Sequence, residues 1–155
     1  MTTIATTFVD VYVLRGREDA LEVLLLRRAR DRVRAGTWEC VHGRIDPGEL
    51  PAECARRELL EETGCHALAL YNLSRVEQFY LHHDDRVALI PVFVAFVTGD
   101  AVVQLSDEHD TWLWLSPEQA RTQWSWPRAE RAIADAVRLL GRGNAGELED
   151  VLRVR

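Results

Sequence analysis

Apolar positions recur along the chain with the spacing of strands in some segments and of helices in others. Alternating or continuous apolar runs predict strands at 7–15, 21–27, 38–42, 76–82, 87–98 and 111–115, with a shorter candidate strand at 101–105. Apolar residues every three or four positions, opened by proline, predict helices at 51–63 and from about 126 to 140, with a short helix beginning near Ser116. Pro91 interrupts the fifth strand, so we expect a bulge or an edge position there.

Strands and helices do not alternate strictly in this order. Three strands precede the first long helix, and further strands follow it before the last two helices. This order favours an α/β fold with a mixed sheet and helices packed against it over a Rossmann fold. We expect a single domain over residues 1–141 and a polar tail over 142–155, which forms a short helix at 147–152 or is partly disordered.

Composition and charge narrow the class of protein. Of the 155 residues 47% are apolar and 28% charged, as in ordinary globular domains, and the net charge is −6. The acidic balance argues against a nucleic-acid partner, and no segment is apolar and long enough to predict a signal peptide or a membrane span. Every basic residue except histidine is arginine, which excludes chemistry based on lysine. Cys40, Cys54 and Cys65 form no C-x-x-C pair, so we expect reduced thiols in a cytoplasmic protein.

Three glutamates crowd one face of the helix at 51–63. At 100° per residue, Glu61 lies about 60° to one side of Glu58 and Glu62 about 40° to the other. By itself this pattern also describes a solvated helix face with ion pairs. Carboxylates so close repel one another unless a cation neutralises them, and Mg²⁺ prefers such oxygen ligands.

The residues around these glutamates decide between the two interpretations. The segment reads G-x5-E-x7-R-E-U-x-E-E-x-G-U, in which U is apolar, and its positions are Gly43, Glu49, Arg57, Glu58, Leu59, Glu61, Glu62, Gly64 and Cys65. Seven such fixed positions match by chance at about 10⁻⁸ per start site. The segment resembles the signature of the Nudix hydrolases, with Cys65 where a larger aliphatic residue is commoner. The resemblance implies the Nudix fold, an α/β/α sandwich with a mixed central sheet.

The resemblance also implies roles for the residues of this segment. Glu58 and Glu62 correspond to the main ligands of Mg²⁺ or Mn²⁺, and Glu61 to a ligand of the same ions, often through water. The carbonyl group of Gly43 corresponds to a further ligand. Arg57 and Glu49 resemble the pair that orients the carboxylates, because an arginine can bind a carboxylate by two hydrogen bonds.

A carboxylate beyond this segment often completes the Nudix site as a ligand or a general base. Glu108 is the candidate here, because it opens the pattern E-H-x-x-x-x-W-L at a spacing found in several Nudix enzymes. An ordinary surface acid is the alternative for Glu108, and Asp107 and Asp110 are the fallback candidates. The histidines and aspartates at 82–85 are better explained as a solvated turn than as a metal site.

Substrate contacts are harder to predict than the metal site. Arg28 and the arginines near it can meet phosphates or belong to a solvated loop, and Trp38 can pack in the core or line the pocket. The aromatic candidates for stacking are Phe8, Tyr12, Trp38, Phe79, Tyr80, Trp124 and Trp126. We select Arg28, Trp38 and Tyr80 as the predicted substrate contacts.

The predicted reaction is hydrolysis of a nucleoside triphosphate, or of a related triphosphate, to the monophosphate and pyrophosphate. The segment from Trp38 to Gly43, with His42 where many Nudix proteins have glycine, resembles the dihydroneopterin triphosphate and dATP pyrophosphohydrolase group. The alternatives are a dinucleoside polyphosphate or a nucleoside diphosphate sugar as substrate, and a Nudix domain that binds a nucleotide without catalysis. The partner is therefore a small diphosphate-containing molecule, and a homodimer is common in the family.

Overall fold

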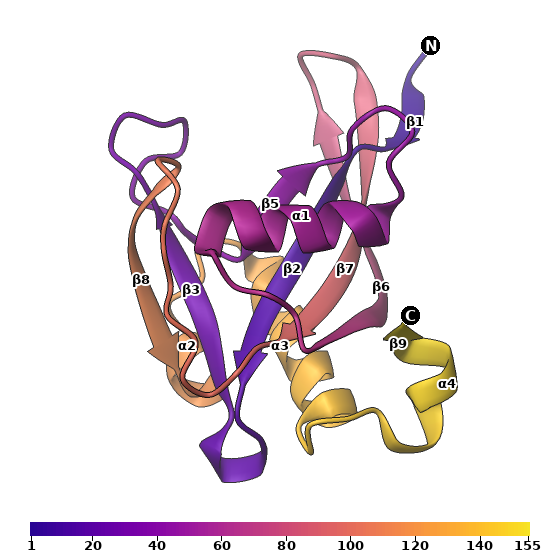
Figure 1. Ribbon diagram of the computed structural model, residues 1–155. Helices are drawn as coiled ribbons and strands as arrows, with labels where there is room; N and C mark the ends of the chain where they lie inside the picture. The colour runs from indigo at the N-terminus through magenta and orange to yellow at the C-terminus, as the bar shows by residue number, and fades with distance from the viewer.

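The computed structural model describes residues 1–155 as one mixed sheet with helices on both faces (Figure 1). The elements are, in chain order, β1 (Thr3–Thr6), β2 (Phe8–Arg15), η1 (Glu18–Ala20), β3 (Glu22–Arg28), β4 (Trp38–Glu39), β5 (Val41–Arg44), α1 (Pro51–Thr63), β6 (Ala69–Leu81), β7 (Arg86–Phe96), β8 (His109–Leu115), α2 (Pro117–Ala120), α3 (Pro127–Leu140), η2 (Gly146–Leu148), α4 (Glu149–Leu152) and β9 (Arg153–Val154). No helix among them combines the length and the apolar character needed to cross a membrane.

The sheet is mixed, as the order of elements predicts. Its main path is β4-β3-β2-β7-β6-β9, while β1 pairs with β7, β5 with β2 and β8 with β3. The pairs β2–β7 and β1–β7 are parallel, and the other pairs are antiparallel. The strands β2 and β7 at the centre are apolar on both sides because each face of the sheet is covered.

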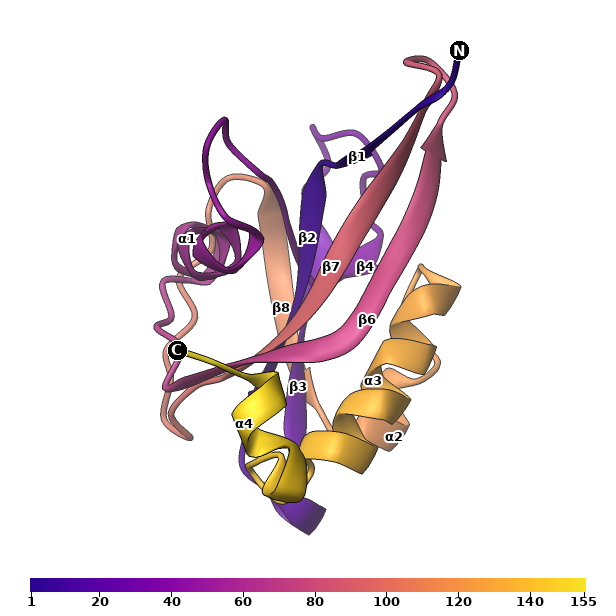
Figure 2. The ribbon, with the colours of Figure 1, turned by 90° about the vertical axis from the view of Figure 1, so that its right-hand side faces the viewer.

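Two separate apolar cores lie on the two faces of the sheet, and Figure 2 shows α1 on one side and α3 on the other. On one face, Ala55 and Leu59 of α1 pack with Val11 of β2. On the opposite face, Ile133 of α3 packs with Tyr12, the next residue of β2. Neighbouring residues of a strand point to opposite faces, so β2 contributes to both cores. This confirms the predicted α/β fold, in which a mixed central sheet has helices on both faces.

The predicted ends of α1 are correct. Pro51 is its first residue, and Gly64 ends it in the left-handed conformation at φ 69°. The irregularity expected at Pro91 is also present. The register of β6 against β7 shifts between Asn72 and Val76, and Val76 pairs with Pro91.

Two segments differ from the sequence prediction. Residues 101–105 form no strand, because the amide of Gln104 donates to Thr63 O at the end of α1 instead of to another strand. The predicted strand 38–42 is two short strands, β4 and β5, which pair with β3 and β2 respectively. The change of partner turns the chain at Cys40 and directs Gly43 toward α1.

The last 14 residues also take part in the sheet. Residues 142–155 include the short helix α4, where the sequence allows a helix, and β9, which pairs with β6 through Val154 and Leu70. Tyr71 Oη on β6 donates to Glu149 at 3.0 Å and so adds a side-chain contact to this segment.

Candidate active site

Arg57 is the centre of the hydrogen bonds on the acidic face of α1. Its Nε and Nη2 donate to the two oxygens of Glu49 at 2.8 and 2.9 Å, and its Nη1 donates to Glu58 Oε1 at 2.7 Å. It also reaches the more exposed Glu61 at 3.2 Å. The hydrogen bonds from Arg57, the largest cause, lower the pKa of Glu49 to about 2. Arg57 therefore holds these carboxylates in one arrangement, which is the contact that the family resemblance implies.

Gly43 on β5 lies directly beneath the Glu58 side chain. A Cβ atom at position 43 would lie 2.0 Å from Glu58 Cδ, so only glycine leaves the carboxylate its present place. This close approach brings the backbone of β5 and the acidic face of α1 to the same point. The two come together although they belong to different elements, because α1 packs across β5 and β2.

Glu62 is a buried carboxylate whose oxygens have no hydrogen-bond partner. Burial is the main cause that raises its pKa well above the ordinary value, and the nearby charges of Glu108, Glu58 and Glu39 raise it further. A buried charge without a partner is unfavourable, and a divalent cation would satisfy both oxygens. No three His, Cys, Asp or Glu side chains converge on one point. Glu58 is engaged by Arg57 instead. The carboxylate oxygens of this face are of the kind that a divalent cation binds. Glu58 and Glu61 accept hydrogen bonds from Arg57, and Glu62 is the carboxylate that no hydrogen bond occupies.

Glu108 is the only one of the three candidate loop acids that lines the pocket next to Glu58. It pairs with Arg28 at 2.7 Å. The fallback residues are engaged elsewhere, since Asp107 pairs with Arg32 and Asp110 with Arg27. The structure therefore brings Glu108 to α1, as the sequence predicts, and leaves the two aspartates outside.

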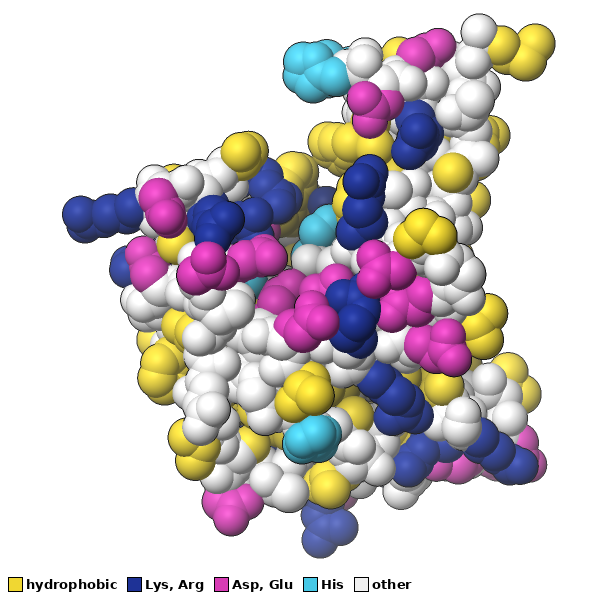
Figure 3. All heavy atoms as spheres, turned by 45° about the horizontal axis from the view of Figure 1, so that its top comes forward, with side chains coloured by type: hydrophobic (Ala, Val, Ile, Leu, Met, Phe, Trp, Pro, Cys, Tyr) yellow, Lys and Arg dark blue, Asp and Glu magenta, His cyan; other side chains and the backbone are white.

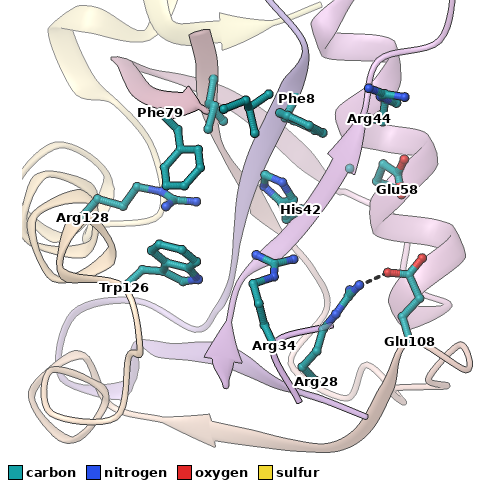
Figure 4. Close-up of a pocket in the computed structure, with 13 residues that line it drawn as sticks. Phe8, Arg28, Arg34, His42, Arg44, Glu58, Phe79, Glu108, Trp126 and Arg128 are labelled. Atoms are coloured by element: carbon teal, nitrogen blue, oxygen red, sulfur yellow. Dashed lines mark hydrogen bonds and ion pairs between the residues drawn. The ribbon is translucent and has the colours of Figure 1, made fainter. Parts of the chain in front are cut away.

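A pocket of about 480 Å³ opens beside these carboxylates. Figure 3 shows acidic side chains gathered in the middle of this face, with arginines around them. The pocket is lined by Phe8, Arg28, Arg34, His42, Gly43, Arg44, Glu58, Phe79, Leu81, Ile90, Glu108, Trp126 and Arg128. Its carboxylates lie at one end and Phe79, Trp126 and Arg128 at the other, as Figure 4 shows. One end thus suits a cation, while the arginines suit phosphate groups.

Of the three predicted substrate contacts, only Arg28 lines this pocket. Trp38 packs against the core on the α3 side of the sheet, so core packing was the correct alternative. Tyr80 is half exposed and donates to Asp85 at 2.9 Å, near the turn that joins β6 to β7. Residues alternate between the faces of a strand, so Phe79 faces the pocket and its neighbour Tyr80 does not.

A buried ion-pair network that the sequence did not predict lies behind the pocket. Asp10 on β2 is completely buried, accepts from His42 Nδ1 at 2.7 Å and accepts from Arg128 Nε at 3.1 Å. It therefore holds two residues of the pocket lining in place. An aspartate inside an otherwise apolar central strand is the signal that could have found it, since buried charges are paired.

A second buried polar group lies behind Glu62. His109 Nε2 is 3.1 Å from Glu39 Oε1, and His109 Nδ1 is 3.7 Å from Glu62 Oε2. Glu39 in turn pairs with Arg28 at 3.5 Å and Arg34 at 3.6 Å. This chain of contacts connects the acidic face of α1 to the arginines of the pocket.

The chain is similar in sequence or in fold to several known proteins. The chain is 38% identical over 109 residues to an octanoyltransferase from Myxococcus xanthus, an alignment that covers 69% of the chain but only 30% of that protein. It is 34% identical over 102 residues to an asymmetrical bis(5'-nucleosyl)-tetraphosphatase from Rattus norvegicus, covering 64% of the chain and 67% of that protein. A C. elegans Ap4A hydrolase in a binary complex shares the fold, with a TM-score of 0.70 at 22% identity over 86% of this chain and 96% of that one.

The match to a family model covers most of the molecule. The model described as the NUDIX domain matches residues 6–136, which run from β1 to α3. The matched range includes the acidic face of α1, the Glu108 loop and every residue that lines the pocket. On this match and the geometry above, the chain belongs to the Nudix family.

Proposed function

We propose that this protein hydrolyses a phosphoric anhydride bond in a nucleoside triphosphate, or in a related triphosphate, to give the monophosphate and pyrophosphate. One observation carries the proposal. The buried Glu62 carboxylate has no hydrogen-bond partner, and it lies near Glu58 and Glu108, which line a pocket together with four arginines. A buried carboxylate without a partner lowers stability. Its presence next to arginines is explained if a cation binds the carboxylate and a polyphosphate binds the arginines. Residues 1–141 form the catalytic domain in this proposal, and 142–155 are a C-terminal tail that adds β9 to the sheet beside β6.

The proposed ligands of Mg²⁺ or Mn²⁺ are Gly43 O and the carboxylates of Glu58, Glu61, Glu62 and Glu108, which lie near one another although no three of them converge on one point. A bound ion of this kind supplies positive charge to phosphate oxygens and lowers the pKa of a bound water. Arg57 keeps Glu58 and Glu61 oriented through its hydrogen bonds. The chain itself therefore prepares the carboxylates before substrate arrives.

The remaining steps belong to the arginines and to one carboxylate. Arg28 and Arg44 lie next to Glu58 and Glu108 and can donate to phosphate oxygens, so that a phosphate competes with Glu108 for Arg28. When water attacks phosphorus, the anhydride P–O bond breaks and pyrophosphate leaves. A carboxylate of the acidic group takes the proton from the water, and Glu62 and Glu108 are the proposed bases.

A dinucleoside polyphosphate is the second candidate substrate. The observation that favours it is the 34% identity to the bis(5'-nucleosyl)-tetraphosphatase. Nucleoside diphosphate sugars would use the same chemistry with another leaving group. A domain that only binds nucleotides is less consistent with the site, because such a domain has no need to keep mutually repelling carboxylates.

A substrate screen tests this proposal. Purified protein with Mg²⁺ is incubated with nucleoside triphosphates, dinucleoside polyphosphates and nucleoside diphosphate sugars, and the products are separated by chromatography. We expect a nucleoside triphosphate to give monophosphate and pyrophosphate. Release of orthophosphate and a diphosphate, or turnover of a dinucleoside polyphosphate alone, would contradict the proposed reaction.

Adding metal should stabilise the protein against heat. Binding to the native state alone contributes about 2.7 kcal/mol when the metal concentration is 100 times the dissociation constant. We therefore expect the midpoint of thermal unfolding to rise with millimolar Mg²⁺ or Mn²⁺, and to rise less in a Glu58→Gln variant. An equal midpoint with and without metal would argue against a site that forms before substrate binds.

A further inference from the structure

The end of the pocket that lies away from the carboxylates is built from hydrogen-bond donors and aromatic rings. We call Phe79, Trp126, Arg34 and Arg128 the distal end. Figure 4 shows Phe79, Trp126 and Arg128 on the side of the pocket away from Glu58, with Arg34 between them and Arg28. The rings of Phe79 and Trp126 meet edge to face, with centroids 5.9 Å apart. The guanidinium groups of Arg128 and Arg34 lie 4.8 and 5.9 Å from the Trp126 ring.

Trp126 carries a donor that the protein leaves unused. Its Nε1 is buried and has no hydrogen-bond partner. A buried donor without an acceptor is unfavourable, so this position is stabilised when an incoming group accepts from it. The two guanidinium groups add further donors and no acceptor.

Acceptors from the protein are scarce at the distal end. Both oxygens of Asp10 are engaged, one by His42 and one by Arg128. Glu39 lies behind Arg34, with only 4% of its side chain exposed. His42 uses Nδ1 toward Asp10, which leaves Nε2 as its one ring nitrogen without a hydrogen bond inside the protein. The distal end therefore favours a ligand group that accepts hydrogen bonds.

The same residues are held firmly in position. Arg128 is fixed by the buried Asp10. The segment before Trp126 is pinned to β4, since Ser125 N donates to Trp38 O at 3.1 Å and Trp38 N donates to Ser125 Oγ at 2.9 Å. Both of these hydrogen bonds join Ser125 to β4, and the next residue, Trp126, directly precedes the first turn of α3. A wall held in this way can distinguish ligands by their hydrogen-bonding groups.

We propose that the distal end binds the nucleobase of the substrate and prefers guanine, hypoxanthine or uracil, which carry a carbonyl oxygen where adenine and cytosine carry an amino group, over adenine or cytosine. This inference rests on the proposed function. The partly exposed ring of Phe79 supplies a stacking surface that a base uses and a phosphate does not. Trp126 Nε1 and the guanidinium groups donate to the carbonyl oxygen. The amino group of adenine or cytosine would instead place its own N–H groups against the N–H groups of Trp126 and the arginines.

The test compares inosine and adenosine monophosphates, whose bases carry oxygen and an amino group at the same carbon. Calorimetric titration of the full chain with Mg²⁺ should show inosine monophosphate binding about tenfold more tightly. Trp126→Phe keeps an aromatic ring but removes the N–H, and it should reduce this preference to about threefold or less.

Trp124→Phe is the matched control. Trp124 Nε1 is also buried without a partner, but this residue packs against the core, edge to face with Tyr12, and does not line the pocket. Trp124→Phe should leave the preference for inosine monophosphate unchanged. Equal binding of the two nucleotides by the unmodified protein, or the same change in both variants, would overturn the inference.

Two further results separate the inference from the proposed function. Monophosphates bind without being hydrolysed, so a preference for inosine monophosphate without turnover of any triphosphate would support the inference and overturn the proposed reaction. Turnover without base preference would overturn the inference alone. If Trp126→Phe weakens inorganic tripolyphosphate as strongly as inosine monophosphate, the distal end binds phosphate and the inference is wrong.

Discussion

Replacing Glu62 by glutamine is expected to abolish turnover while leaving the protein folded. The two side chains have nearly the same shape, but glutamine cannot hold a cation by charge. Loss of several kcal/mol of transition-state stabilisation corresponds to a decrease in turnover of roughly 10³-fold or more. The measurement is the steady-state rate at saturating Mg²⁺ with the best substrate of the screen. An unchanged rate would overturn the assignment of Glu62 to the metal site.

The same variant should be at least as stable as the unmodified protein when no metal is present. Glu62 is buried and neither of its oxygens accepts a hydrogen bond, so its charge opposes folding. Removing the charge removes that cost. Glu53→Gln is a suitable control on the same helix, because its side chain accepts from the Leu50 amide and glutamine can still accept there. We expect Glu53→Gln to change neither turnover nor the midpoint of thermal unfolding appreciably.

Asp10→Ala is expected to be the most destabilising of the substitutions considered. Asp10 is completely buried, and its removal leaves Arg128, whose side chain is only 15% exposed, without its partner. Breaking a buried pair in this way costs about 3–5 kcal/mol, a large part of the free energy of unfolding of an ordinary domain. Chemical denaturation at neutral pH measures this difference.

Asp135→Ala is the matched control, because it also removes an aspartate that pairs with an arginine. Asp135 accepts from Arg75 at 2.6 Å, but its side chain is 47% exposed, and such pairs contribute only about 0–1 kcal/mol. Equal losses in the two variants would contradict the view that burial makes the Asp10 network important for stability.

Acid should reduce the effect of Asp10→Ala. Burial raises the pKa of Asp10, but the hydrogen bond and charge of His42 and the charge of Arg128 outweigh it, so that the pKa lies below its ordinary value of 3.8. A lowered pKa stabilises the folded protein above the unfolded value, and this contribution is lost as the pH falls through the folded value. The difference between the two proteins should therefore be constant near neutral pH and decrease below about pH 4.

The fold prediction succeeded where a local pattern contained the answer. Pro51 and Gly64 determine where α1 begins and ends, and Pro91 marks the bulge in its strand pair. The fold prediction failed where a contact with a residue far away in the sequence decided the local structure. Residues 101–105 have the composition of a strand, but Gln104 binds the end of α1. No local pattern tells the two outcomes apart, because both satisfy the backbone amide.

The site shows the same division. Glu58, Glu61 and Glu62 share a helix face because of helix periodicity, so their spacing in the sequence is sufficient to group them. The aromatic lining could not be predicted in this way. Phe79 and Tyr80 are neighbours, and only the register of β6 against β7 decides which of them faces the pocket.

The sequence by itself determined the family and grouped Glu58, Glu61 and Glu62 on one helix face near Arg57, and it named Glu108 as the first of three candidate loop acids. These features depend on residues close together in the chain or on a recognisable spacing. Only the tertiary structure decided what surrounds them: Glu62 is buried without a partner, and Asp10 meets Arg128 from 118 positions away. Such contacts arise where helices pack across a sheet, and packing brings together residues whose separation along the chain carries no pattern.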